Sequence, residues 1–421
     1  MLKKYWSYLI ILVLIFVPLY PKFPLFAVGG SFVAVRLEDF VIAAVVGIWF
    51  LVSWKNRFSD LKNPVSAAIL LYLAAGVVSW FSGGFLTHTI DFKLGFLHLL
   101  RRVEYMSLFW VGFGLLKDRL NLRFVINCIL LVSLLVSLYG LGQQYLNFPV
   151  ISTNNSEFSK GLVLTLGPGA RLNSTFAGHY DLAAFSILPI LLVIGLLAQP
   201  ARHKWLLAAI GSLAYGVMLL SASRVTFAAV IVTAGLFILV LRKYKWLAIL
   251  VVVTIVSVLA SGQLMSRYLE FITSHAYAAV DTEVPDALKP AANPNEDRSL
   301  NIRLNAEWPQ AWRAFVKNPV LGTGFSSVGL AVDNDYLRVL AETGALGLAA
   351  FSLILWRIGK TCLPFIKSRP ASVEQIFVVT VGFFLLGILL NAIFIDVFEA
   401  SKVAILTWLL LGVGEYVKKS A

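Results

Sequence analysis

Apolar stretches about as long as a membrane-spanning helix recur along the whole chain. The hydrocarbon core of a bilayer requires about 20 apolar residues in a helix that crosses it. Hydrophobic residues make up 59% of the 421 residues, and charged residues only 14%, a balance that water-soluble domains do not show. The sequence therefore predicts an all-α, polytopic membrane protein for which lipid is the main solvent.

Twelve such stretches, bounded by charged residues, prolines and glycines, are predicted to be spans. They lie near residues 5–20, 38–54, 64–81, 98–116, 122–141, 180–198, 204–221, 224–241, 245–262, 338–357, 373–395 and 401–417. The first stretch lacks a small-residue cleavage pattern, so we expect it to be retained as a span. An even number of spans places both termini on one side of the membrane, and residues 1–421 then form a single membrane domain.

The distribution of lysine and arginine predicts the orientation, because these residues accumulate in short cytoplasmic loops. With a cytoplasmic N-terminus, the inner loops are strongly basic and include Lys117, Arg242 and Lys367, whereas the outer loops are nearly neutral. The net charge of +13 then reflects topology, and nucleic acid is not implied as a partner. We expect both termini to be cytoplasmic.

Two predicted outer segments are long, residues 143–179 and residues 262–337, the second lying between spans nine and ten. Loops of this length usually carry function or lack fixed structure. From Leu300 to Phe315, apolar residues including Trp308 and Trp312 recur every three or four positions. This pattern predicts an amphipathic helix lying in the membrane interface, with Pro309 either kinking it or starting its second half.

Charged residues are predicted near the outer ends of spans and at the middle of none. A transporter is expected to carry ionisable groups near the bilayer midplane, so this placement disfavours a lipid-linked oligosaccharide flippase, which stays an alternative. Arg171, Arg224 and Arg303 fall where loops meet the membrane. A guanidinium can clamp phosphate oxygens with two donors. For any single arginine the first interpretation is extension toward lipid head groups, except for Arg224, where the very short loop favours a function. A structural protein without catalysis is a third possibility.

Asp333 is the candidate general base, because a carboxylate can accept the proton of an attacking sugar hydroxyl. Its position before a predicted span also suits a helix N-cap. Glu342 is interpreted first as an interfacial carboxylate bound by a nearby arginine. The histidines, and the cysteines Cys128 and Cys362, lack the spacing of metal ligands, so no metal site is expected.

Four short stretches carry a family resemblance. They are Arg171-Leu-Asn-Ser-Thr-Phe176 running on to Asp181; Leu220-Ser-Ala-Ser-Arg224; Arg303, Trp312 and Asn318-Pro-Val-Leu-Gly-Thr-Gly-Phe325; and Asp333-Asn-Asp-Tyr-Leu337 through Gly347. Their order and spacing resemble the O-antigen ligase and O-antigen polymerase superfamily, bacterial membrane glycosyltransferases that use undecaprenyl-diphosphate-linked glycans. The resemblance covers roughly residues 171–348, and the first 140 residues agree only in hydropathy.

The resemblance implies a GT-C-like, inverting glycosyltransferase of the bacterial cytoplasmic membrane that uses no metal, cofactor or nucleotide sugar. Arg171 and Arg224, together with Arg303, would bind the donor diphosphate, and Asp333 would deprotonate the acceptor. Supporting roles would fall to three neighbours of Asp333, namely Asn334, Arg338 and Glu342. Family ligases typically carry His-Asn where this chain has Asp-Asn, so the identity of the base stays open, as does the choice between ligase and polymerase. The implied partners are an undecaprenyl-diphosphate-linked oligosaccharide, a glycan or lipid acceptor, and membrane lipids.

Overall fold

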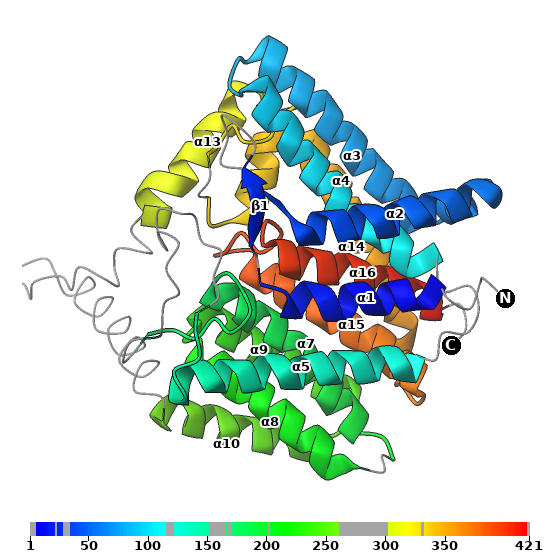
Figure 1. Ribbon diagram of the computed structural model, residues 1–421, viewed down its shortest axis with the longest axis vertical. Helices are drawn as coiled ribbons and strands as arrows, with labels where there is room; N and C mark the ends of the chain where they lie inside the picture. The colour runs from blue at the N-terminus through cyan, green and yellow to red at the C-terminus, as the bar shows by residue number, and fades with distance from the viewer. Residues whose placement is uncertain are drawn as a thin grey trace, which may run out of the picture.

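The computed structural model describes residues 6–21, 23–27, 34–114, 122–150, 166, 170–200, 203–260, 302–329 and 332–418. These residues form mostly helices, as predicted (Figure 1). The first helices are α1 (Trp6–Leu19), α2 (Leu37–Lys55), α3 (Pro64–Phe81), α4 (Phe92–Gly114) and α5 (Leu122–Tyr145). A small antiparallel sheet of β1 (Pro24–Ala27) and β2 (Ala34–Arg36) joins α1 to α2.

The second part of the bundle contains the helices that surround the candidate site. They are α7 (His179–Leu197), α8 (Lys204–Leu220), α9 (Arg224–Val240), α10 (Lys245–Ala260), α13 (Trp308–Lys317), α14 (Asp335–Ser368), α15 (Val373–Asn391) and α16 (Ser401–Lys418). Short π-helical turns cover Ser82–Leu86 and Arg303–Glu307. A short 3-10 helix covers Ser59–Lys62.

Each of the twelve predicted spans overlaps a helix. Within the described ranges, six helices are long and apolar enough to cross a membrane: α2, α3 with its π-helical extension, α5, α7, α14 and α15. Four shorter helices, α1, α8, α9 and α10, are also apolar. The chain is thus a multi-pass helical membrane protein, and the count of twelve spans stays a prediction.

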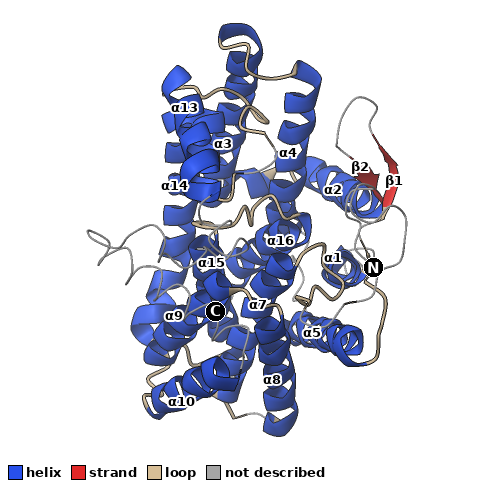
Figure 2. Ribbon diagram, turned by 90° about the vertical axis from the view of Figure 1, so that its left-hand side faces the viewer, coloured by secondary structure: helices blue, strands red, loops and turns tan. Residues whose placement is uncertain are grey.

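Glycines allow α4 and α16 to pack with their backbones in contact. A Cβ atom added to Gly112 would strike the carbonyl of Leu409, and one added to Gly412 would strike the carbonyl of Phe109. Small residues at such crossings are typical of helix pairs in membranes. Helix α16 lies at the middle of the bundle, where Figure 2 shows α7, α15 and α16 side by side.

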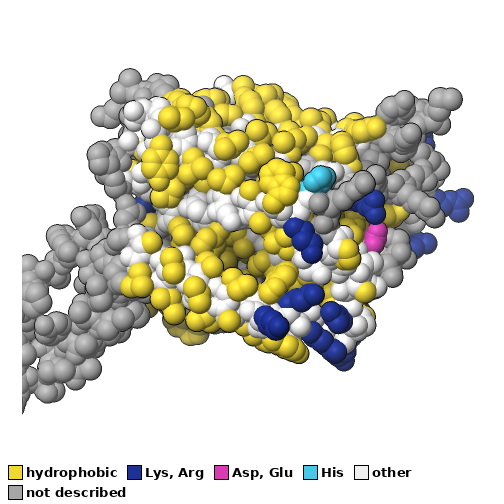
Figure 3. All heavy atoms as spheres, turned by 90° about the horizontal axis from the view of Figure 1, so that it is seen from below, with side chains coloured by type: hydrophobic (Ala, Val, Ile, Leu, Met, Phe, Trp, Pro, Cys, Tyr) yellow, Lys and Arg dark blue, Asp and Glu magenta, His cyan; other side chains and the backbone are white. Residues whose placement is uncertain are grey.

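The surface of the bundle is apolar along its length and basic at one end. On α10, large side chains such as Ile249, Val252 and Leu259 are exposed. Figure 3 shows a mostly hydrophobic face with lysine and arginine side chains gathered toward one end. Helix α1 begins and α16 ends at that same end (Figure 1). This asymmetry supports the predicted arrangement of the termini on one side.

The amphipathic helix predicted around Pro309 is present in two parts. The π-helical turn at Arg303–Glu307 leads into α13, with Pro309 in the first turn of α13, so Pro309 starts the second half. Ala311 and Ala314 face the protein, while Trp312 is 54% exposed. Leu300 lies outside the described residues. The structure therefore supports an amphipathic helix whose outward apolar side can meet lipid.

Helix α14 contains a sharp kink that positions the candidate site. Gly344 has φ 66° and ψ −171°, a backbone conformation that favours glycine, and a Cβ atom there would strike the carbonyl of Val320. The turn after α13 is hydrogen-bonded to α14 just before the kink. The backbone N–H groups of Thr323 and Gly324 donate to the carbonyls of Ala341 and Glu342. The first segment of α14, residues 335–343, is thereby held at the end of the bundle.

Candidate active site

Arg303 and Asp333 form a close ion pair. The Nε and NH2 atoms of Arg303 donate to Oδ2 of Asp333 at 2.9 and 2.7 Å. The Arg303 side chain is 10% exposed and the Asp333 side chain 31%. Glu307 accepts a hydrogen bond from the Asp333 backbone at 3.0 Å, and the Trp308 indole donates to the Asp333 carbonyl at 3.4 Å. The carboxylate is therefore fixed by the helix before it and still reaches the surface.

Asn334, not Asp333, caps α14. Its Oδ1 accepts the backbone N–H of Leu337 at 2.9 Å. The N-cap alternative for Asp333 is therefore wrong, because the next residue takes that role. The Asp333 carboxylate is left to interact with Arg303 and with whatever enters the site.

Arg338 lies among three carboxylates. Its guanidinium is 3.6 Å from Glu342, 3.6 Å from Asp396 and 3.9 Å from Glu399. The contact with Arg338 confirms the expected pairing of Glu342 with an arginine. Glu342 also accepts the backbone N–H of Ser326 at 3.1 Å. These contacts tie α14 to residues 392–400. Arg338 and Glu342 lie on α14, one turn or more after Asp333, and their contacts hold α14 in place.

Asp396 was not singled out from the sequence. Its side chain is 32% exposed, yet the pKa of Asp396 is raised to about 6. Burial is the main cause; Arg338 lowers the value, whereas Asp333 and Asp181 raise it. A carboxyl group that titrates near neutral pH therefore lies beside the candidate base. No sequence signal marks it, because its neighbours come from two distant segments, one around Asp181 and one from Asp333 to Arg338.

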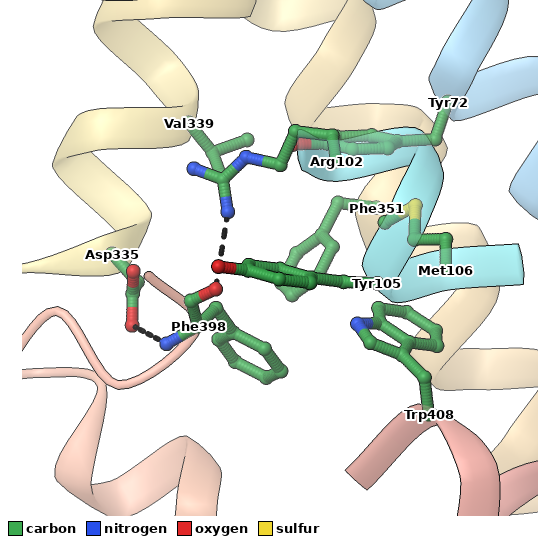
Figure 4. A pocket seen from close by; sticks show the side chains of 9 residues that line it. All are labelled: Tyr72, Arg102, Tyr105, Met106, Asp335, Val339, Phe351, Phe398 and Trp408. Carbon is green, nitrogen blue, oxygen red and sulfur yellow. Dashed lines mark hydrogen bonds between the residues drawn. The ribbon is translucent and has the colours of Figure 1, made fainter. Parts of the chain in front are cut away.

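Beneath this cluster is a narrow cavity lined by Tyr72, Arg102, Tyr105, Met106, Asp335, Val339, Phe351, Phe398 and Trp408 (Figure 4). Two of its polar groups hold the backbone of Phe398: Arg102 donates to the carbonyl at 3.3 Å, and Asp335 accepts the N–H at 3.1 Å. Arg102 also pairs with Glu399. These contacts fix the loop that carries Asp396. The residues that line the cavity therefore support the site from below.

Arg171 and Arg224 lie on neighbouring segments. Arg171 NH1 is 3.1 Å from Nε2 of His179, and Leu172 donates a backbone hydrogen bond to Leu220 at 3.2 Å. Arg224 is the first residue of α9, whose N-cap is Ser223. The turn around Arg171 therefore packs against the end of α8, four residues before Arg224.

The first turn of α7 links these arginines to Asp333. His179 contacts Arg171, and the next residue, Tyr180, interacts with Arg303. Burial lowers the pKa of Arg303, but Asp333 and a hydrogen bond with Tyr180 raise it by more, so the guanidinium is firmly charged. The three predicted arginines and Asp333 thus belong to one connected end of the bundle, and Arg303 contacts Asp333 directly.

The segment of Arg171 depends on a buried lysine that sequence analysis did not select. Lys402 is fully buried and donates from Nζ to the carbonyls of Pro18, Tyr20 and Thr175 at 3.2, 2.8 and 2.6 Å. It joins α1, the Arg171 turn and α16. A lysine in the first turn of an otherwise apolar helix was the only available signal.

The electrostatics of this end favour an anion. Helices α7, α9 and α14 all begin here, on the side that faces the viewer in Figure 2. Helix N-termini carry a partial positive charge and present unpaired N–H groups. Together with Arg171, Arg224 and Arg303 they can hold a phosphorylated ligand next to a carboxylate. The arrangement suits binding of a diphosphate and removal of a proton from a neighbouring hydroxyl.

Part of the chain is similar to a known protein family. A model of the O-antigen ligase family matches residues 206–352, from the start of α8 into α14. The match contains Arg224, Arg303 and Asp333, whereas Arg171 precedes it. No curated protein matches the chain. Residues 206–352 are therefore similar to the O-antigen ligase family, and this match supports the resemblance found in the sequence.

Proposed function

We propose that this protein transfers or polymerises an oligosaccharide from an undecaprenyl-diphosphate donor at the outer face of a bacterial cytoplasmic membrane. The observation that carries the proposal is the Arg303–Asp333 pair, set among Arg171, Arg224 and three helix N-termini. The family match supports a ligase-like or polymerase-like role. The donor, the face of the membrane and the mechanism are parts of the proposal.

In the proposed reaction, an acceptor hydroxyl attacks the anomeric carbon of the donor sugar. A new carbon–oxygen bond forms as the bond from that carbon to the diphosphate breaks, with inversion of configuration. Asp333 takes the hydroxyl proton, and undecaprenyl diphosphate leaves. No metal is required in this scheme, because Arg171 and Arg224 stabilise the charge that develops on the leaving diphosphate.

Arg303 has a double role in this scheme. Two of its donors hold Asp333 Oδ2, so it orients the carboxylate toward the acceptor. Its charge also adds to the field of the other two arginines. Arg338 and Glu342 act behind this layer by holding α14 against residues 392–400.

Purified protein in liposomes, supplied with an undecaprenyl-diphosphate oligosaccharide, tests the proposal. Wild-type protein is expected to form a transferred or extended glycan in the presence of EDTA, and Arg224→Ala and Asp333→Asn to lose this activity while remaining folded. A ladder of products would identify a polymerase, and a single transfer a ligase. Movement of intact lipid between leaflets, without a glycan product, would contradict the proposal and favour the flippase alternative.

A further inference from the structure

An open apolar groove runs between α14 and α15. Its walls include Leu355, Ile358 and Ile366 from α14, and Val379, Leu386 and Leu389 from α15. The space measures about 590 Å³ including its open side. Every lining side chain is apolar or a cysteine, so the groove suits a hydrocarbon chain and offers nothing to a polar ligand.

Hydrogen bonds join α14 to α15 beside the groove. At the site end, the Tyr336 hydroxyl donates to the Leu389 carbonyl at 2.9 Å. Farther along, the Cys362 thiol contacts the Val378 carbonyl at 3.7 Å. The kink at Gly344 lies between Tyr336 and the α14 wall of the groove. Helix α14 therefore contacts α15 through Tyr336 before the kink and through Cys362 after it.

One end of the groove adjoins the candidate site. Leu389 is two residues before Asn391, whose Oδ1 accepts the Thr226 hydroxyl at 2.6 Å. Thr226 is two residues after Arg224, and the Tyr336 that caps the groove is three residues after Asp333. A chain lying in the groove would therefore bring its head group to the arginines and the carboxylate.

We infer that this groove binds the isoprenoid chain of the lipid-linked donor, in the part next to the diphosphate. The inference rests on the proposed function and specifies where its substrate lies. From Val379 to Leu389 the helix rises about 15 Å, so the groove takes the first isoprene units, and the remaining tail extends into the bilayer. The continuity of an all-apolar wall with a diphosphate-binding end is what selects this occupant over a bulk phospholipid.

Gly359 allows the groove to be filled without disturbing the core. It is exposed on the α14 wall, and a Cβ atom there meets no atom within 4 Å. Gly359→Trp therefore places a ring in the groove. Gly47→Trp on α2 is the matched control, because Gly47 is also an exposed helical glycine with no atom within 4 Å of an added Cβ. Leu386→Trp fills the groove from the opposite wall.

The experiment measures binding of undecaprenyl diphosphate to protein in phospholipid nanodiscs. Gly359→Trp and Leu386→Trp are expected to weaken binding at least tenfold, and Gly47→Trp to match wild type. In transfer assays, both groove variants should lose activity with the undecaprenyl donor, and Gly47→Trp should retain it. Equal binding by wild type and both groove variants, or no binding above that of nanodiscs without protein, would overturn the inference.

These outcomes separate the groove from the proposed function. Groove-dependent binding of undecaprenyl diphosphate without any glycan transfer would uphold the groove and contradict the glycosyltransferase. Transfer that is equally efficient in Gly359→Trp, Leu386→Trp and wild type would uphold the glycosyltransferase and overturn the groove.

Discussion

Arg303 holds a single oxygen of Asp333 with two donors, at 2.9 and 2.7 Å. These two donors fix the direction of the carboxylate. Asn334 supplies the helix cap, so Asp333 can be changed without removing the start of α14. This separation makes the catalytic proposal testable by substitution.

Asp333→Asn is expected to lower kcat roughly 100-fold or more, because an amide cannot accept the acceptor proton and general-base catalysis contributes about this much. The KM for the donor should change little. Single-turnover transfer rates measure the effect. A melting temperature equal to that of wild type is the control for folding, and a fully active Asp333→Asn variant would remove Asp333 from the mechanism.

Arg303→Lys is expected to retain charge but lose the two-donor contact. We predict a fall in kcat smaller than that of Asp333→Asn, because the carboxylate loses one of its two fixed donors. Arg303→Ala should lower kcat further than Arg303→Lys. If Arg303→Lys has the kcat of wild type, Arg303 has no positioning role.

Arg171→Ala and Arg224→Ala should each lower kcat/KM for the diphosphate donor by roughly 10- to 100-fold, since a hydrogen bond to a charged group contributes about 1.5–3 kcal/mol. Steady-state kinetics with purified protein provide the measurement. Arg313→Ala is the matched control, because Arg313 is an exposed arginine on α13. Equal effects at all three positions would indicate general attraction to anionic lipid.

Asp396 predicts a dependence of stability on pH. Its folded-state pKa of about 6 lies above the ordinary value of 3.8, so the folded protein binds the proton more tightly than the unfolded chain. The contribution of this group is therefore most favourable at low pH and is lost as the pH rises from about 4 to about 6. As the pH rises through that window, the melting temperature of wild type should fall relative to that of Asp396→Asn. If the melting temperatures of the two proteins change with pH in parallel, the pKa of Asp396 is not raised.

Gly344→Ala is expected to destabilise the protein by about 1–3 kcal/mol and reduce activity, because its positive φ and the Val320 carbonyl exclude a Cβ atom. Gly47→Ala should be neutral or slightly stabilising, since space is open there. Thermal unfolding in detergent compares the two. A neutral Gly344→Ala would show that the kink adapts.

Hydropathy located the helices well because a membrane span must be apolar along its length. The stretch predicted at 224–241 is α9, Arg224–Val240. Ends were less accurate where polar residues continue a helix. Helix α4 begins at Phe92, not near 98, and α14 extends to Ser368, not 357, because backbone hydrogen bonding continues into polar turns that a hydropathy pattern excludes.

Site residues could be predicted from the sequence only where the residue type itself indicated a chemical role, such as phosphate binding by arginine. Arg303 and Asp333 were both selected, but their contact depends on the path of the chain between them. The kink at Gly344 depends on Val320, and the pKa of Asp396 depends on Asp181 and Asp333. Such features arise from tertiary contacts between distant segments, which single-sequence patterns do not contain.

Cleavage of the donor and transfer of its glycan are tested most directly by measuring released undecaprenyl diphosphate and glycan product together. The liposomes contain wild type or Asp333→Asn, and EDTA is present. We expect equal molar amounts of both products with wild type and neither product with the variant. Intact donor lipid recovered on the opposite leaflet, without release of undecaprenyl diphosphate, would contradict this expectation.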